Sequence, residues 1–152
     1  LYHTQRQYSK AEPLYKRALA IREKALGPDH PDVATTLNNI GELHYAQSQY
    51  AQAEPCHKRS LAIREKALGP DHPDVATSLN NLAVLYRAQG QYEQAELLHK
   101  RALAIIEKSL GPDHPYVATS LNNLAALYSE TNRTKAAAEL EKRAAHIRTI
   151  KR

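Results

Sequence analysis

Three asparagine pairs are the residues of this sequence with the clearest chemical meaning. Asn38-Asn39, Asn80-Asn81 and Asn122-Asn123 recur at a spacing of 42 residues. Asparagine is a poor residue inside a helix and costs roughly 0.5 kcal/mol relative to alanine. Its carboxamide can bond both the C=O and the N–H of an extended peptide. The pairs therefore indicate a row of peptide-backbone contacts; alternatively, one asparagine of each pair ties its helix to a neighbouring carbonyl.

The eight histidines invite a metal interpretation, which their spacing disfavours. His30, His72 and His114 occur once per 42 residues, too far apart in stacked units to share a metal ion at about 2 Å. Each precedes a proline, so we expect a structural role at the start of a helix. His57 and His99 fall at packing positions and are expected to be core or half-core residues.

The residues that covalent or acid–base catalysis would need are not arranged for it. Cys56, the only cysteine, aligns with Leu14 and Leu98, which predicts a small apolar core residue and excludes an internal disulfide. No spacing places a base beside it, and neither a glycine-rich phosphate loop nor a patterned carboxylate pair occurs. We therefore expect no enzyme, no cofactor and no metal.

The elements that position these residues repeat with the same period. The segment from Gly27 to Asn39 returns almost unchanged from Gly69 and from Gly111. A period of roughly 20–50 residues indicates a stacked repeat. We predict an all-α protein, an α-solenoid of antiparallel helix pairs with about three and a half repeats. The expected array covers residues 1–152, as a partial repeat 1–26, full repeats 27–68 and 69–110, and a drifted last repeat 111–152.

Helical periodicity, prolines and glycines predict the helix bounds. The first six residues match the tail of a first helix. We therefore expect that helix to end after them and a second helix to run from about Ser9 to Leu26. Ser48, Gly90 and Asn132 stand at equivalent positions, where a positive φ would make a tight turn. The further helices are expected at residues 31–47, 50–68, 73–89, 92–110, 115–131 and 134–150.

The formal charge of +5, from 21 basic and 16 acidic residues, could suggest nucleic acid or acidic partners. However, the repeated Lys-Arg pairs follow glutamates by four residues, which predicts helix faces that pair their own charges. We therefore expect no nucleic-acid partner. With no signal peptide and no apolar run of about 18 residues, we also expect no membrane segment and an intracellular, cytoplasmic protein.

Each unit resembles a tetratricopeptide repeat, and the 42-residue form with Leu-Asn-Asn-Leu and Gly-Pro-Asp-His-Pro resembles the repeats of kinesin light chains. The matching pattern positions are Leu37, Ile40, Gly41, His44, Tyr50, Ala53, His57 and Ser60, and their counterparts 42 residues later. Ala83 and Ala125 replace the usual glycine, one small residue for another. The resemblance implies a right-handed superhelix whose concave side is lined by the first helix of each repeat.

The resemblance also implies that an extended peptide binds along this concave groove. A carboxylate clamp would need basic groove residues, and only Arg87 offers one, beside Glu42 and Glu130. We therefore predict a protein-interaction scaffold whose partner is a protein or peptide. The predicted groove residues are Asn38, Asn39, Tyr45, Asn80, Asn81, Val84, Arg87, Asn122, Asn123 and Ser129.

A structural spacer or self-assembly module is the alternative function. The helix of the first half-repeat has no partner helix from its own repeat, which would expose Ala11, Leu14 and Ala18. Self-association through exposed terminal repeats is therefore the competing expectation. A sensor segment of a larger signalling protein is a third option.

Overall fold

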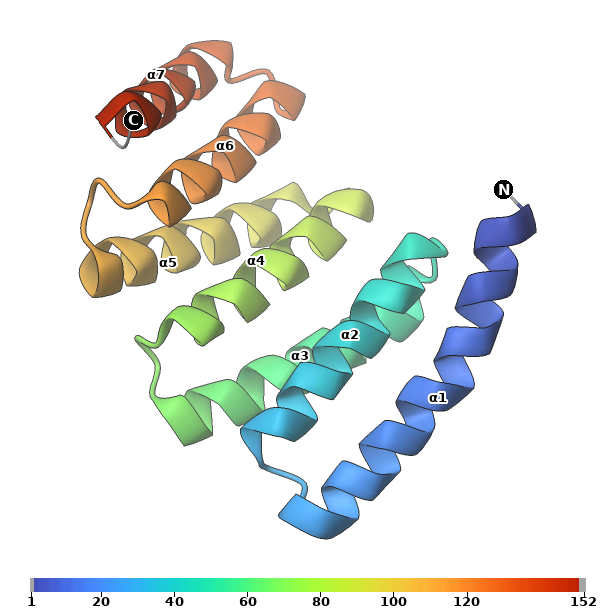
Figure 1. Ribbon diagram of the computed structural model, residues 1–152. Helices are drawn as coiled ribbons and strands as arrows, with labels where there is room; N and C mark the ends of the chain where they lie inside the picture. Colours follow the sequence, from blue (N-terminus) through green and yellow to red (C-terminus); the bar gives the residue numbers. More distant parts are fainter. Residues whose placement is uncertain (1, 151–152) are drawn as a thin grey trace. The chain divides into compact units, whose positions relative to one another are not determined.

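The computed structural model describes residues 2–150, with side chains from Arg6 onward. Leu1, which the sequence assigns to the tail of a helix, lies outside the described residues. Within them the chain contains helices and short connections, and no strand. The helices, labelled in Figure 1, are α1 (Tyr2–Leu26), α2 (Pro31–Ala46), α3 (Tyr50–Leu68), α4 (Pro73–Ala88), α5 (Tyr92–Leu110), α6 (Pro115–Glu130) and α7 (Thr134–Ile150).

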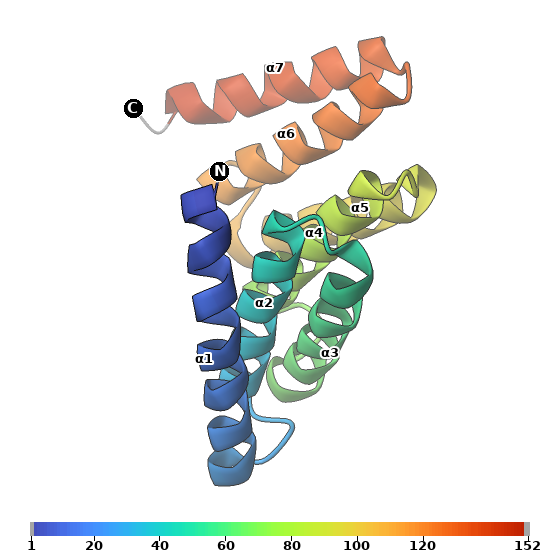
Figure 2. The ribbon, with the colours of Figure 1, turned by 90° about the vertical axis from the view of Figure 1, so that its right-hand side faces the viewer.

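The helices are distributed over two compact units, Leu1–Pro70 and Asp71–Arg152. The first unit holds α1, α2 and α3, and the second holds α4 to α7. Within each unit, a short helix and the longer helix that follows it form an antiparallel hairpin: α2 with α3, α4 with α5, and α6 with α7 (Figures 1 and 2). The short helices are α2, α4 and α6, and the long helices are α1, α3, α5 and α7. The predicted α-solenoid of helix pairs is thus confirmed. Along the chain, the boundary between the two units falls in a Gly-Pro-Asp loop, next to the predicted repeat boundary.

The short helices begin where the histidines predict. His30, His72 and His114 each precede the proline that opens a helix, with extended backbone. In each case Nδ1 accepts a hydrogen bond from the backbone N–H two residues later, at 3.0, 3.0 and 3.1 Å. This bond satisfies one of the N–H groups that a helix start leaves without an internal partner. The predicted structural role of these histidines is confirmed.

The turn inside each hairpin also follows the prediction. Ser48, Gly90 and Asn132 have φ values of 59°, 76° and 63°. Arg6 occupies the corresponding place in the first repeat, and there the prediction is wrong, because α1 runs without a break from Tyr2. A long side chain such as arginine disfavours the positive φ that the turn requires. The segment therefore extends the helix.

The core of each unit lies between short and long helices. In the first unit, Val33 and Leu37 of α2 pack against Ile63 of α3, with Leu19 of α1 beside them. In the second unit a cluster of mostly small residues and leucines joins the helices α4, α5, α6 and α7: Ala83, Ala95, Leu124, Ala125, Leu127, Tyr128 and Ala137. Small residues allow the helices to approach closely. None of the helices in the described range is long and apolar enough to cross a membrane.

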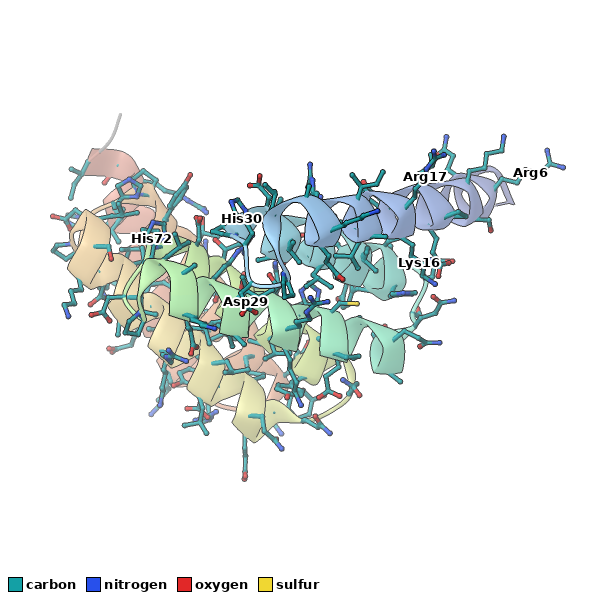
Figure 3. The ribbon with its side chains drawn as sticks, turned by 90° about the horizontal axis from the view of Figure 1, so that it is seen from below. Arg6, Lys16, Arg17, Asp29, His30 and His72 are labelled. Carbon is teal, nitrogen blue, oxygen red and sulfur yellow. The ribbon has the colours of Figure 1, made fainter. Side chains whose placement is uncertain are left out.

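The charged residues largely pair with one another. Lysines follow glutamates at the predicted i,i+4 spacing, with distances of 3.0, 3.3 and 2.9 Å in Glu12–Lys16, Glu54–Lys58 and Glu96–Lys100. A second set joins successive long helices of one unit, such as Arg59 to Glu23 at 2.9 Å. Figure 3 shows Lys16 and Arg17 leaving α1 on different sides. Exposed pairs of this kind contribute little stability but neutralise the helix faces.

Candidate functional site

Three of the predicted groove residues line one cavity in the second unit. Asn80 and Asn81 come from α4 and Asn123 comes from α6, and Ile106 of α5 contributes as well. The cavity has a volume of about 270 Å³. All its lining residues are uncharged; the remaining ones are Ala76, Thr77, Tyr116, Thr119 and Ser120. Asn122 is half-buried on α6 and is not part of the lining.

The first asparagine of the α4 pair has a partner inside the hairpin. Oδ1 of Asn80 lies 3.0 Å from Nδ1 of His99, so the ring donates a hydrogen bond to the amide carbonyl. His99 is only 1% exposed. Asn80 therefore ties α4 to the core of α5, through a side chain rather than through a carbonyl of the backbone. Asn81, the second member, is half-buried at the cavity.

The equivalent histidine in the first unit is bonded differently. His57 is 2% exposed, and its Nδ1 is buried without a hydrogen-bond partner among the described residues. Its ring lies against Gly41, where an added Cβ would come within 2.6–2.9 Å of ring atoms. Gly41 therefore permits a close approach that Ala83, at the matching position of α4, would prevent.

Both buried rings are held in the neutral form. Burial lowers the pKa of His57 to about 4, helped by the positive charge of Arg64. Burial lowers the pKa of His99 to about 4 as well, helped by the charge of Arg87. Desolvation disfavours the charged imidazolium whether or not the ring has a hydrogen-bond partner. These histidines are core residues, as the sequence predicts.

The predicted groove residues of α2 belong to the first unit. Asn38 is buried, and its Nδ2 donates to Oε1 of Glu42 at 3.4 Å. Asn39 is half-buried. Tyr45 is exposed, and its ring lies 5.6 Å from that of Tyr50 in a tilted arrangement.

Arg87, the basic groove residue of α4, is already neutralised. Its Nη2 forms a close ion pair with Oε1 of Glu130 at the end of α6. The same hydrogen bond holds the pKa of Glu130 below its ordinary value. A free carboxylate would have to compete with Glu130 for this guanidinium. Of the other two predicted groove residues of the unit, Val84 is half-buried and Ser129 is exposed.

A second hollow of the same unit lies by the turn of the α4–α5 hairpin. Glu96 is one of its lining residues, and its carboxylate accepts from Arg133 at 2.8 and 3.1 Å and from the hydroxyl of Tyr128 at 3.0 Å. Together with Lys100, these donors lower the pKa of Glu96 to about 2, the bond from Arg133 being the largest cause. The Arg133 guanidinium also lies 4.0 Å from the centre of the Tyr128 ring. This network explains the local structure without a ligand.

Tyr116 is the cavity residue that the sequence prediction missed. It is 60% exposed, and its ring meets that of His114 edge-on at 4.9 Å. Asp32 and Asp74 stand at the equivalent positions of α2 and α4. This change of residue type within an otherwise repeated segment was the signal that could have drawn attention to it. Ile106 gave no such signal, because it reads as an ordinary core residue.

The residues with metal-binding or nucleophilic side chains are dispersed over the described part of the chain. No three histidine, cysteine, aspartate or glutamate side chains between residues 2 and 150 gather as a metal site would require. Cys56 is half-buried rather than a core residue, and the aligned Leu14 and Leu98 are exposed and half-buried, so this position of the repeat is not fully buried. Burial raises the pKa of its thiol, which keeps it protonated and unreactive.

Comparison with known proteins places this geometry in a family. A model of the tetratricopeptide repeat matches residues 1–66, 32–108 and 98–149. No curated protein sequence matches the chain.

Solved structures agree with that match. BtubC (BKLC) from P. vanneervenii superposes with a TM-score of 0.87 at 28% identity over 98% of this chain, which spans 59% of that protein. A kinesin-light-chain-like protein from Podosopora anserina with nearly identical TPR-like repeats gives 0.82 at 28% identity, over 99% of this chain and 71% of that one. RapI gives 0.80 over 96% of this chain and 51% of its own, at 19% identity, and shares the fold.

Proposed function

Because the chain belongs to the tetratricopeptide repeat family, whose members are typically non-catalytic scaffolds, we propose that it binds an extended peptide segment of a partner protein. The observation that carries the proposal is the cavity between α4 and α6, where Asn81 and Asn123 line the same hollow. The proposal assigns no catalytic step. Its setting is intracellular, where proteins of this family are common.

The two asparagines suit a peptide backbone. An extended peptide presents C=O and N–H groups, and each carboxamide can accept from one and donate to another. Asn81 and Asn123 occupy matching positions on consecutive short helices. A peptide lying across α4 and α6 would therefore meet one carboxamide, with its donor and its acceptor, on each of the two helices. Asn80 is committed to His99 and holds the site in shape.

The charges near the cavity limit which chemical classes of ligand can bind there. The cavity lining is uncharged, and Arg87 is paired with Glu130. A free C-terminal carboxylate or a run of acidic residues would find no available cation in this lining. The main contacts are therefore expected with backbone amides and with uncharged side chains of the ligand.

The proposal is tested by fluorescence anisotropy with pools of labelled extended peptides that differ in charge. We expect saturable binding of at least one pool, weakened about tenfold or more in an Asn81→Ala/Asn123→Ala variant, because two hydrogen bonds are lost. Gln52→Ala on the exposed side of α3 removes a carboxamide that is not part of the cavity lining and is the matched control. Equal affinity of the double variant and the wild type would contradict the proposal.

Assembly through α1 is a second candidate function, supported by a different observation. Ile21 of α1 is 57% exposed, whereas its counterparts Ile63, Ile105 and Ile147 are 1–4% exposed beneath the short helix of their own hairpin. Leu14 is 68% exposed on the same helix. Burying such side chains stabilises an interface by roughly 1.5–3 kcal/mol each.

Light scattering over a range of concentrations tests this second candidate. A mass that rises with concentration, and that an Ile21→Glu variant holds at the monomer value, would support assembly through α1. A constant monomer mass of the wild-type chain at every concentration would contradict it.

A further inference from the structure

The aromatic wall of the α4–α6 cavity has no counterpart in the other short helices. The second residue of α2 and of α4 is an aspartate, Asp32 or Asp74, and the second residue of α6 is Tyr116. An aspartate in the first turn interacts favourably with the positive end of the helix dipole. Replacing it by tyrosine gives up that interaction at α6.

The protein itself gives little in return for this exchange. Tyr116 is 60% exposed, so its ring is not part of the core, and its ring contact is with His114, beside it at the start of the helix. Exposed aromatic rings at the edge of a hollow are enriched where partners bind, because they offer a large rigid contact area. The edge-on contact with His114 holds the ring in place beside the cavity.

The size and lining of the cavity define what would lie beside this ring. At about 270 Å³ it is below the range of roughly 300–1,000 Å³ that encloses a whole small molecule, so it suits one or two side chains. Ile106 and Ala76 are nearly fully buried and give it an apolar base. Thr77 and Thr119 add methyl groups as well as hydroxyls, and no lining side chain could neutralise a ligand charge.

We propose that the cavity selects an apolar side chain of the bound peptide, aliphatic or aromatic, which packs between Tyr116 and Ile106 while Asn81 and Asn123 hold the flanking backbone. This inference rests on the proposed peptide-binding function and deepens it. Tyr116 is the residue that determines specificity, because an aspartate at this place would put a negative charge beside the pocket. The expected ligand is an extended peptide with an uncharged apolar residue at one position.

The experiment uses labelled peptide pools that share degenerate flanks and differ in one central residue, fixed as leucine, phenylalanine, lysine or aspartate. We expect the leucine or phenylalanine pool to bind the wild type best. Tyr116→Phe should keep this affinity, whereas Tyr116→Asp should weaken it about tenfold or more and shift preference toward the lysine pool. Aspartate is already the second residue of α2 and of α4, so Tyr116→Asp is expected to fold. Circular dichroism verifies this.

The possible outcomes separate the two levels of the hypothesis. If all pools bind equally well, and Asn81→Ala/Asn123→Ala abolishes binding while Tyr116→Asp does not affect it, the peptide site stands and the side-chain inference is overturned. If no pool binds at all, the peptide-binding function fails and this inference fails with it. Asp74→Asn, which changes the equivalent residue of α4 outside the cavity lining, should leave every pool unaffected.

Discussion

The hairpins α2–α3 and α4–α5 place an asparagine, a small residue and a histidine at matching positions, yet they connect them differently. In the second unit, Asn80 accepts from His99, and Ala83 stands at the position that Gly41 has in the first unit. In the first unit, Asn38 donates to Glu42, and the His57 ring sits on Gly41 with Nδ1 lacking a partner among the described residues.

The difference separates two effects that are often treated as one. Both rings have a pKa of about 4, because burial dominates in each. The hydrogen bond from His99 to Asn80 should therefore affect conformational stability without setting the pKa. It also fixes α4 beside α5 at the cavity, where the second asparagine, Asn81, lies. The second unit is accordingly the candidate for recognition, because the cavity and this bond occur in the same unit.

The largest expected effect is acid destabilisation shared by both hairpins. His57 and His99 stay neutral when folded down to about pH 4 but take up a proton near pH 6.5 when unfolded. The unfolded state thus binds more protons between these values. Stability should be complete above about pH 6.5 and decrease toward pH 4, by on the order of 3 kcal/mol for each ring.

Urea unfolding at a series of pH values measures this effect. Replacing one histidine by leucine should remove about half of the pH dependence, whichever of the two is changed. Glu96, whose pKa is lowered to about 2, loses its stabilising charge only at pH values below about 4.5, so its contribution falls in a separate window. A stability that is constant between pH 6.5 and 4 would contradict the neutral, buried state of the rings.

The next effect distinguishes the two histidines. His99→Leu leaves Oδ1 of Asn80 without its partner, which should cost about 1–3 kcal/mol. His57→Leu removes a nitrogen that is buried without a partner, so its net cost should be smaller by about 1 kcal/mol or more. Urea unfolding at neutral pH compares them. Equal losses would show that the Asn80 bond contributes nothing to stability.

A smaller effect concerns the residue beneath the ring. Gly41→Ala should gain about 1 kcal/mol of helix propensity but lose about 1–3 kcal/mol through the contact with the His57 ring, for a net loss near 1 kcal/mol. In a His57→Ala background the same change should become stabilising, since the ring is gone. A double-mutant cycle gives the coupling between the two positions. Additive effects would refute the close packing.

The smallest effect concerns the reason why Asn38 and His57 of the α2–α3 hairpin do not form the hydrogen bond that joins Asn80 and His99. Val84 occupies in α4 the place of Glu42 in α2. Glu42→Val should remove one partner of Asn38 and let its amide turn toward His57, with a gain of about 0.5 kcal/mol. A change in the 15N shift of His57 Nδ1 would report the new bond. An unchanged shift would mean that the Asn38 amide stays where it is without Glu42.

Much of the architecture could be predicted because it is encoded in short, repeated signals. The His-Pro starts, the Gly-Pro ends and the residues at positive φ fixed six helices to within a residue or two. The start of α1 could not be predicted from register alone, since Arg6 stands where the other repeats have the residue that forms the turn. Periodicity describes what the repeats share, and α1 departs from it.

The candidate site was predictable only in its repeated part. The asparagines were identifiable because they occur as pairs in three helices. The partner of Asn80 depends on a rotamer and on the neighbouring helix, which sequence spacing does not specify. Tyr116 was overlooked because a repeat pattern points to residues that recur in every copy. Specificity can instead arise where one copy departs from the others.

The most direct measurement is an NMR titration of the 15N-labelled chain with the tightest-binding peptide pool, following the side-chain NH2 groups of the asparagines. We predict that the signals of Asn81 and Asn123 shift together and saturate at one concentration, along with the ring protons of Tyr116. Saturable shifts confined to other surfaces, such as the exposed side of α1 at Leu14 and Ile21, would contradict a peptide site between α4 and α6.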